Sequence, residues 1–238
     1  MPRTSRPSAT PADKTAAEPS ARQTMLETAE RLFAEEGLEA VPLHRIVQES
    51  GQRNRSALHY HFGSRPEVVS HVIAMRLPEV NALRHRYLDE AEAKGLANDL
   101  REVLLASTSA LADIVRDQPW GARYARILAQ ANYNPELCRY DLIPRDYTSS
   151  LRRAHVMIGK LLPEVPGAIV DERLIWVEDS VVMTLGRLAR LGREAVSKAV
   201  IHSLVDFCVG GLQADFSREA KGPRKTHSLA STRQGLSA

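Results

Sequence analysis

The sequence predicts an all-α protein in which a small three-helix head precedes a larger helical bundle, with about nine helices in all. Two observations support this fold class. Apolar residues recur with the helical period through nearly every segment between residues 20 and 216, and the interruptions fall at glycine and proline. No segment has the alternating pattern of a strand, and no internal repeat is found.

The first helix is expected to begin at Ser20 and to end at Gly37. Ser20 and Gln23 have the spacing of a capping box, in which each side chain bonds the other residue's backbone N–H. Gly37 suits the left-handed backbone that commonly ends a helix. The residues between them form one apolar stripe, which consists of Met25, Ala29, Leu32 and Phe33.

Two short helices complete the head. The first spans about 43–50 and is followed by a turn at Gly51, and the second spans about 53–61. A second capping box, from Ser64 to Glu67, opens the next helix. Two short helices joined by a glycine turn and braced by a preceding amphipathic helix form a helix-turn-helix, whose second helix can enter the major groove of DNA.

The head is assigned to residues 20–76 and the helical bundle to residues 77–216. Glycine or proline separates the segments of the bundle from one another. The expected helical segments are 79–94, 99–117, 120–132, 135–162, 169–191 and 194–215. Pro144 is expected to kink or split the segment that contains it.

Two tails flank the helical region. Residues 1–19 are rich in Pro, Ser, Thr and Ala and contain almost no large apolar side chains, so we expect a disordered arm. Residues 217–238 have a similar composition and are basic. Such a tail either attracts DNA weakly and without specificity or only keeps the protein soluble.

Composition limits the class of protein. A chain of 238 residues with 43% apolar residues can bury a sizeable core. The two cysteines, Cys138 and Cys208, lack metal-ligand spacing and do not form a disulfide framework, which favours a reducing cytoplasm. No apolar stretch approaches the roughly 20 residues of a membrane span, and no signal-peptide core is found, so no membrane partner is expected.

Positive charge gathers in the head. Five arginines stand against two acidic residues between His44 and Arg76, and four of the eight histidines also fall there. A solvated basic face is the alternative explanation. The start of the second short helix carries only hydrogen-bonding side chains, from Gln52 to Ser56. Arginine can bind guanine with two hydrogen bonds, and Asn or Gln can bind adenine in the same way.

Three stretches of the head carry a resemblance to a known family. They read LFAEEG (32–37), IVQESG (46–51) and LHYHFGSR (58–65). Residues 21–65 thereby resemble the DNA-binding domain of the tetracycline-repressor (TetR) family, whose pattern is "xxLFAExG", "IAxxAG" and "LYxHFxSK". The match covers about 50 of the 238 residues, and the three pieces together are fairly specific.

The chain departs from this pattern at two places. It has one residue more between Gly51 and Leu58, and His59 stands where the family has tyrosine. The resemblance implies phosphate contacts from His59 and His61, and Arg65 takes the place of the family's lysine. The predicted DNA-binding residues are His44, Arg45, Gln52, Arg53, Asn54, Arg55, Ser56, His59, Tyr60, His61 and Arg65.

Other roles for residues of the head are less favoured. Phe62 is expected to close the core of the head rather than to contact DNA. His59 and His61 do not share a helix face, and neither HExxH nor CxxC occurs, so no metal site is predicted. No catalytic signature and no cofactor-binding motif is found, and an enzyme is not expected.

The resemblance implies a dimer interface and an effector pocket in the bundle. The last two helices are the expected dimer elements; 169–191 carries an apolar stripe, and 194–215 contains the small pair Gly210 and Gly211. That stripe can also be internal core. Large apolar and aromatic side chains line most ligand sites. The candidate pocket residues are Trp120, Tyr124, Leu128, Tyr133, Tyr140, Met157, Trp176 and Met183, each of which can equally be a core residue.

The sequence therefore predicts a homodimeric, ligand-responsive transcription regulator, acting as a repressor on a palindromic operator, with an unidentified small-molecule effector. The alternative is an architectural or non-specific DNA-binding protein without an effector.

Overall fold

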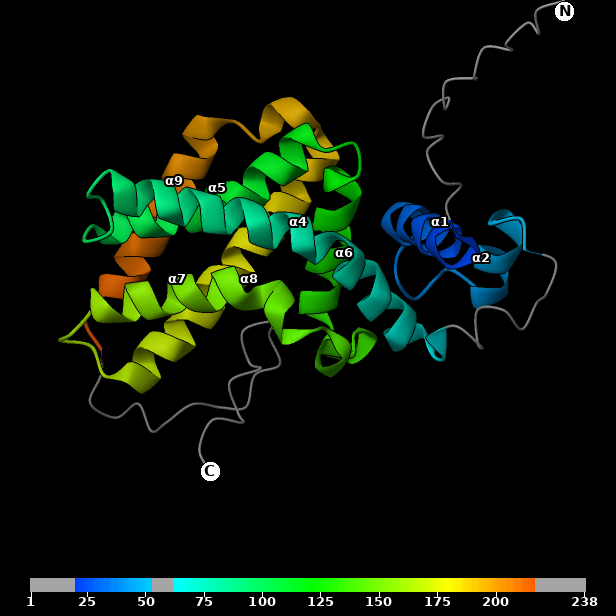
Figure 1. The fold of residues 1–238 in the computed structure, drawn as a ribbon, viewed down its shortest axis with the longest axis horizontal. Helices are drawn as coiled ribbons and strands as arrows, with labels where there is room; N and C mark the ends of the chain where they lie inside the picture. The colour runs from blue at the N-terminus through cyan, green and yellow to red at the C-terminus, as the bar shows by residue number, and fades with distance from the viewer. Residues whose placement is uncertain (1–19, 53–61, 217–238) are drawn as a thin grey trace, which may run out of the picture.

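The computed structural model describes residues 20–52 and 62–216, which form α-helices and short 3-10 turns without a strand (Figure 1). The expected all-α fold is confirmed. The helices are α1 (Ala21–Glu36), α2 (Leu43–Glu49), α4 (Arg65–Ala93), α5 (Leu100–Asp117), α6 (Gly121–Tyr133), α7 (Ser149–Lys160), α8 (Gly167–Leu191) and α9 (Lys198–Gln213). The 3-10 turns are η1 (Pro135–Leu137), η2 (Tyr140–Leu142), η3 (Arg145–Thr148) and η4 (Arg193–Ala195).

Helix α1 begins and ends where the sequence predicts. Ser20 Oγ accepts a hydrogen bond from Gln23 N at 3.2 Å, and Gly37 ends the helix with a φ of +104°. The Gln23 side chain, however, donates to Glu27 at 2.7 Å rather than returning to Ser20, so only half of the expected capping box forms. The apolar stripe of α1 is buried, with Leu32 and Phe33 fully covered.

Helix α2 packs beside α1 in the head (Figure 1). Ile46 and Val47 face the core and are almost completely buried, which is the inner face that the sequence predicts. The turn at Gly51 has a φ of +75°, a left-handed conformation that glycine adopts without strain. The helix predicted at 53–61 lies outside the described residues.

Helix α4 is one continuous helix of 29 residues, and it corrects the expected division into a head helix and a separate helix at 79–94. Pro78 lies inside it on the exposed side, while the neighbouring Leu77 and Val80 are buried. Proline lacks an N–H and removes one helical hydrogen bond. Burial of the apolar stripe on both sides of Pro78 keeps the helix intact, so α4 runs from the head into the bundle (Figure 1).

The start of α4 confirms the second capping box. Glu67 Oε2 accepts a hydrogen bond from Ser64 N at 2.6 Å, and the Ser64 side chain caps the first turn. Carboxylates near a helix N-terminus are favourable because the first N–H groups lack helical partners.

The bundle is built on close packing of α6 against α8. A Cβ atom added to Gly186 on α8 would lie 2.6 Å from Ala129 Cβ on α6, so only glycine permits this approach. Tyr124, Ile127 and Leu185 are fully buried along the contact. Helix α9 covers α5, where Arg101 bonds Asp206 at 2.7 Å.

The segment 135–162 differs most from its prediction. In place of one long helix, it forms η1, η2 and η3 before α7 begins at Ser149, so the segment is split rather than kinked, which is one of the two expected effects of Pro144. Proline at 135 and 144 and the irregular backbone between them prevent a continuous helix. The two later segments are confirmed as α8 and α9, with η4 between them. No helix in the described part of the chain is long and apolar enough to cross a bilayer.

Candidate nucleic-acid interface and effector cavity

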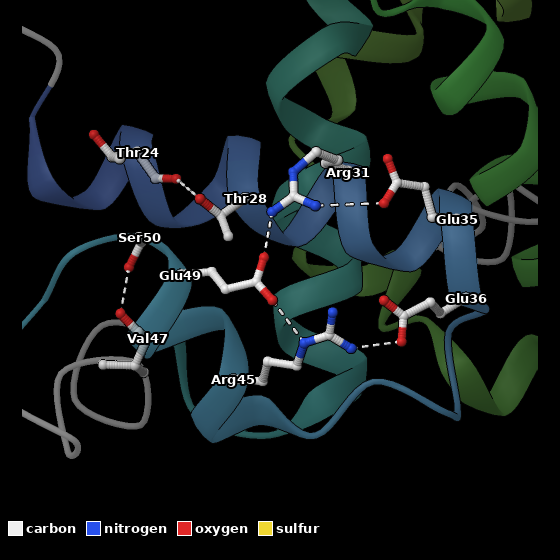
Figure 2. Close-up of polar contacts among 9 residues, drawn as sticks. All are labelled: Thr24, Thr28, Arg31, Glu35, Glu36, Arg45, Val47, Glu49 and Ser50. Carbon is white, nitrogen blue, oxygen red and sulfur yellow. Dashed lines mark hydrogen bonds and ion pairs between the residues drawn. The ribbon is translucent and has the colours of Figure 1, made fainter.

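A chain of ion pairs fixes α2 against α1 (Figure 2). Glu49 accepts from Arg31 Nη2 at 2.5 Å and from Arg45 Nε at 2.6 Å, and Arg45 Nη1 reaches Glu36 at 2.6 Å. The hydrogen bonds from Arg31 and Arg45 lower the pKa of Glu49. Arg45, a predicted DNA contact, therefore has two carboxylate partners within the head.

Four of the predicted DNA-binding residues fall in the described part of the chain. His44 is exposed on α2, and Gln52 is half-buried after the Gly51 turn. Arg65 Nη1 donates to the carbonyls of Leu38 and Val41, at 2.7 and 2.6 Å. These bonds tie the α1–α2 loop to the start of α4, a structural contact that the sequence does not reveal.

The other predicted contacts lie outside the described residues. They are Arg53, Asn54, Arg55, Ser56, His59, Tyr60 and His61. The structure does fix the end of this segment, because Phe62 is 4% exposed and belongs to the core of the head, as expected.

Phe62 is held between α1 and α4. The Arg22 guanidinium lies 5.0 Å from the centre of its ring, and the His71 ring lies 5.4 Å from it. Arg22 Nη2 also lies 3.3 Å from His71 Nδ1. Burial, with the nearby Arg22 charge, lowers the pKa of His71, so this histidine is neutral and can accept from Arg22 at neutral pH.

A buried carboxylate joins the head to the bundle. Glu30 on α1 has no exposed surface and accepts two hydrogen bonds from Arg76 on α4, at 2.9 and 2.8 Å. Arg76 in turn lies over the ring of Trp120, 4.7 Å from its centre. Gln130 on α6 adds a bond at 2.9 Å from Leu38 N to its side-chain oxygen. The head is thereby anchored to both α4 and α6.

A cavity of about 80 Å³ lies within the bundle, lined by residues of α4, α5, α6, α7 and α8 together with η3. Its walls are largely apolar. The polar groups that line it are Arg84, Ser107, Thr108, Tyr124, Asn132, Tyr147, Thr148, His155 and Glu178. An apolar cavity with a few polar groups has the character of a small-molecule site.

Charged groups at this cavity are buried and paired. Arg84 Nε donates to the Ser107 carbonyl at 3.1 Å and Nη1 to Ser150 Oγ at 3.3 Å. Burial lowers the pKa of Arg84, and Glu178 opposes that shift. His155 Nε2 contacts Glu178 Oε1 directly. The polar side of the cavity thus holds both positive and negative groups.

The Tyr124 hydroxyl is a buried polar group at the cavity. Tyr124 has no exposed surface, and its oxygen has no hydrogen-bond partner among the described residues. Burial raises the pKa of Tyr124, so the group is a neutral hydroxyl that can donate and accept. A buried polar group without a partner costs about 1–3 kcal/mol, so a ligand that bonds this hydroxyl recovers that free energy.

The structure places some of the candidate pocket residues at the cavity and others away from it. Tyr124 and Leu128 line the cavity, and Tyr140 bonds the lining residue Asn132 at 3.2 Å. Trp120 lies against Tyr124 and Arg76 at the junction with the head, and Met157 is partly buried against the core. Three candidates are exposed outside the cavity, namely Tyr133, Trp176 and Met183.

The polar lining residues that were missed from the sequence include Arg84, His155 and Glu178. The sequence did contain a signal for Arg84. Arg84 interrupts an apolar stripe of α4 that includes Val80 and Leu88, so its side chain had to be buried or the stripe broken. A charge on a buried helix face is a candidate for a polar group within a cavity.

Two family models match the chain. Residues 25–72 match the model described as bacterial regulatory proteins, tetR family, and residues 106–211 match the tetracyclin repressor-like C-terminal domain. Together they cover more than half of the sequence. The protein is a DNA-binding transcription regulator, and the chain belongs to the TetR family.

One solved structure with a similar fold is a TetR family transcriptional regulator, PfmR, from Thermus thermophilus. It is 19% identical, covers 83% of this chain and all of its own, and superposes with a TM-score of 0.44. At that similarity it carries no argument about function. Comparison with curated proteins gives no significant match.

Proposed function

We propose that this regulator is a homodimeric repressor that a small molecule releases from its operator. The observation that carries the proposal is the buried cavity, where the Tyr124 hydroxyl lacks a partner among the described residues and α4 forms part of the wall. The effector that fits this cavity is small and mostly apolar, and it bears a group that can hydrogen-bond to Tyr124.

Helix α4 couples the cavity to the DNA-binding head. Leu77, Val80 and Arg84 of α4 line the cavity, and the same helix begins with Arg65 bonded to the head. A ligand that moves this wall of the cavity moves the head as well. The resulting change in DNA affinity cannot exceed the ligand's difference in affinity for the two conformers.

The exposed apolar side chains of α8 and α9 support a dimer. Trp176 and Leu191 on α8 are 55 and 71% exposed, and Phe207 on α9 is 72% exposed. Large apolar residues in such numbers on neighbouring helices indicate an interaction surface. A twofold dimer also presents two heads to a palindromic site.

Selection of bound duplexes from a random pool tests the DNA-binding part of the proposal. A homodimer is expected to return a palindrome whose half-sites are about 34–36 Å apart. Equal binding to every duplex, with affinity lost between about 50 and 200 mM salt, would instead favour the non-specific DNA-binding class. Transcription in vitro from a promoter that overlaps the selected site is expected to fall when the protein is added.

A screen of small organic molecules for release of the operator complex tests the cavity. Leu128→Trp fills the cavity and is expected to bind the operator normally but to resist release by any molecule found. Tyr124→Phe is expected to weaken release by about tenfold, because a single hydrogen bond is lost. Release that is unchanged in both variants would place the effector elsewhere.

A further inference from the structure

A second recess lies outside the cavity, where the head meets the bundle. It is an open groove of about 640 Å³ between residues 36–40, which end α1 and begin the following loop, and the sides of α6 and α8. None of its lining residues lines the cavity at Tyr124. The groove is therefore a separate place for a ligand, in contact with both the head and the bundle.

Three arginines line this groove: Arg126 on α6, and Arg187 and Arg190 on α8. Within the described ranges, 20–52 and 62–216, none of the three forms an ion pair, although half of the other arginines there do. Arg126 Nε is buried and has no hydrogen-bond acceptor there. A buried guanidinium N–H without an acceptor is rare in proteins, because it loses its hydration without compensation.

The carboxylates near the groove do not neutralise it. Glu36 lines the groove but is bonded to Arg45 at 2.6 Å, and Glu35 is bonded to Arg31. Glu39 is the one other carboxylate among the described lining residues, against three arginines. The groove therefore has an excess of positive charge.

The arginines also oppose one another. Burial lowers the pKa of Arg126, the neighbouring Arg190 charge lowers it further, and Glu35 opposes this shift without cancelling it. The helix dipole at the C-terminal end of α8 compensates part of the positive charge of Arg190, which lies in the last turn of that helix. Arg126 lies within α6, so no helix end compensates its charge. An anion placed between these side chains would relieve the repulsion and supply the missing acceptor.

Apolar side chains form the rest of the wall. Tyr133 is 83% exposed and Met183 is 44% exposed at the groove, and both are large side chains that exclude water when covered. The groove thus combines anion-binding groups with an apolar surface that can contact an organic body.

We propose that this groove binds a small organic anion, which carries a phosphate or carboxylate group between Arg126, Arg187 and Arg190 and rests its apolar part on Tyr133 and Met183. Such a ligand contacts residues 36–40 of the head and two helices of the bundle at once. Its binding restrains the head independently of the effector cavity, and it gives the regulator a second input.

Calorimetric titration of the purified full-length protein tests this site. The probes are phenyl phosphate and benzoate, with phenol as the neutral counterpart and inorganic phosphate as the anion without an apolar part. We expect phenyl phosphate to bind more tightly than phenol and inorganic phosphate, and benzoate to show whether the site prefers phosphate or carboxylate. Raising the salt concentration should weaken the binding of both organic anions.

Arg126→Gln and Arg190→Gln are each expected to weaken phenyl phosphate binding by about tenfold, because each removes a charge-assisted hydrogen bond. Arg187→Gln, on the exposed face of α8, should act in the same direction without any effect on folding. Arg145→Gln is the matched control, since Arg145 is exposed on η3, outside the groove, and should leave the affinity within about twofold.

Three results would overturn the proposal. The first is the absence of binding by either organic anion, and the second is binding that the groove variants and Arg145→Gln affect equally. The third is that Arg187→Gln or Arg190→Gln abolishes the dimer while the wild type binds no anion. That result would mean that these arginines form ion pairs with carboxylates of a second copy of the chain. Unfolding curves of each variant show whether a loss of binding reflects a loss of fold.

Discussion

Glu30 is a carboxylate without exposed surface at the meeting point of α1, α4 and α6. Arg76 forms two hydrogen bonds to it, and Arg123 Nε lies 4.0 Å away. A buried ion of this kind contributes little net stability as a pair, but it becomes costly when one partner is removed. At the scale of single residues, Glu30 is one of the polar groups that link α1 to α4 and α6.

Glu30→Ala is therefore expected to lower the free energy of unfolding by about 3 kcal/mol, because Arg76 loses both acceptors in a buried position. Urea denaturation followed by circular dichroism measures the change. Glu35→Ala is the control, since that carboxylate is half exposed and pairs with Arg31 along one helix, and its effect should stay below about 0.5 kcal/mol. Equal effects in the two variants would contradict the anchoring role of Glu30.

His71 gives the head a dependence on pH. Its pKa is lowered from the ordinary 6.5 by burial and by Arg22, so the neutral form is favoured in the folded state. A lowered pKa contributes stability that is present above the unfolded value and is lost as the pH falls through the folded value. We expect the wild type to lose stability relative to His71→Gln between about pH 7 and pH 5.

Thermal unfolding at a series of pH values measures this difference. Glutamine can still accept a hydrogen bond from Arg22, but it does not titrate. His44→Gln serves as the matched histidine control, because His44 is exposed on α2 rather than packed beside Arg22 and Phe62. Parallel profiles for wild type and His71→Gln would mean that the Arg22 contact does not depend on protonation of His71.

At the scale of elements, α4 connects the head to the cavity, since its first turn belongs to the head and its later turns form part of the cavity wall. Arg65 is the residue that fastens this first turn, through the carbonyls of Leu38 and Val41. The family resemblance implies a DNA contact from the same residue. The two roles have different consequences when the side chain is removed.

The variant Arg65→Ala distinguishes the structural role of Arg65 from a role in contacting DNA. If the internal bonds dominate, the variant leaves two carbonyls without their donor and loses about 1–3 kcal/mol of stability. If the side chain mainly contacts phosphate, stability is kept, and the slope of log affinity against log salt concentration falls by about one. We expect the first outcome, which urea denaturation and DNA titration at several salt concentrations can distinguish.

Local signals made most of the elements predictable. The limits of α1 follow from Ser20 and Gly37, and the start of α4 follows from the capping box at Ser64, because these features depend on residues close in sequence. The expected separate helix at 79–94 was wrong. Proline normally ends a helix, but tertiary burial of Leu77 and Val80 explains why α4 continues through Pro78. Pro144 predicted an interruption in 135–162, but the division of 135–148 into three 3-10 turns is not encoded by the prolines alone.

The cavity was less predictable than the fold. Size and aromaticity selected Trp176 and Tyr133, which are exposed, because such residues serve interfaces as well as pockets. The polar lining of Arg84, His155 and Glu178 comes from three helices that meet only in the folded chain. Their sequence positions alone do not show which charges lie opposite one another.

At the scale of the whole molecule, the outer faces of α8 and α9 bear the apolar surface that a dimer would bury. Phe207 is the most exposed aromatic residue of α9, and Gly210 and Gly211 follow it one turn later on the same side. Small residues beside a large one let helices from two copies approach closely while the ring fills the space between them.

Phe207→Glu is expected to yield a monomer. Two phenylalanines are lost in each dimer, and each is worth about 2 kcal/mol when buried, so the dimer Kd should rise by at least about a hundredfold. Sedimentation velocity at several protein concentrations measures the change. Val156→Glu on α7, where Val156 is also half exposed, should leave the dimer unaffected, and a dimer that persists in Phe207→Glu would move the interface elsewhere.

Because α4 continues unbroken through Pro78, a tilt of the helix at the cavity also moves its other end, at the head. From Arg84 to Arg65 the helix rises about 28 Å, so a tilt of about 5° at the cavity displaces the head by about 2.5 Å. Hydrogen bonds to base edges tolerate far less than that distance. Because the length of the arm multiplies the motion, the effector that we propose would need only small side-chain shifts around Arg84 to lower the affinity of the head for DNA.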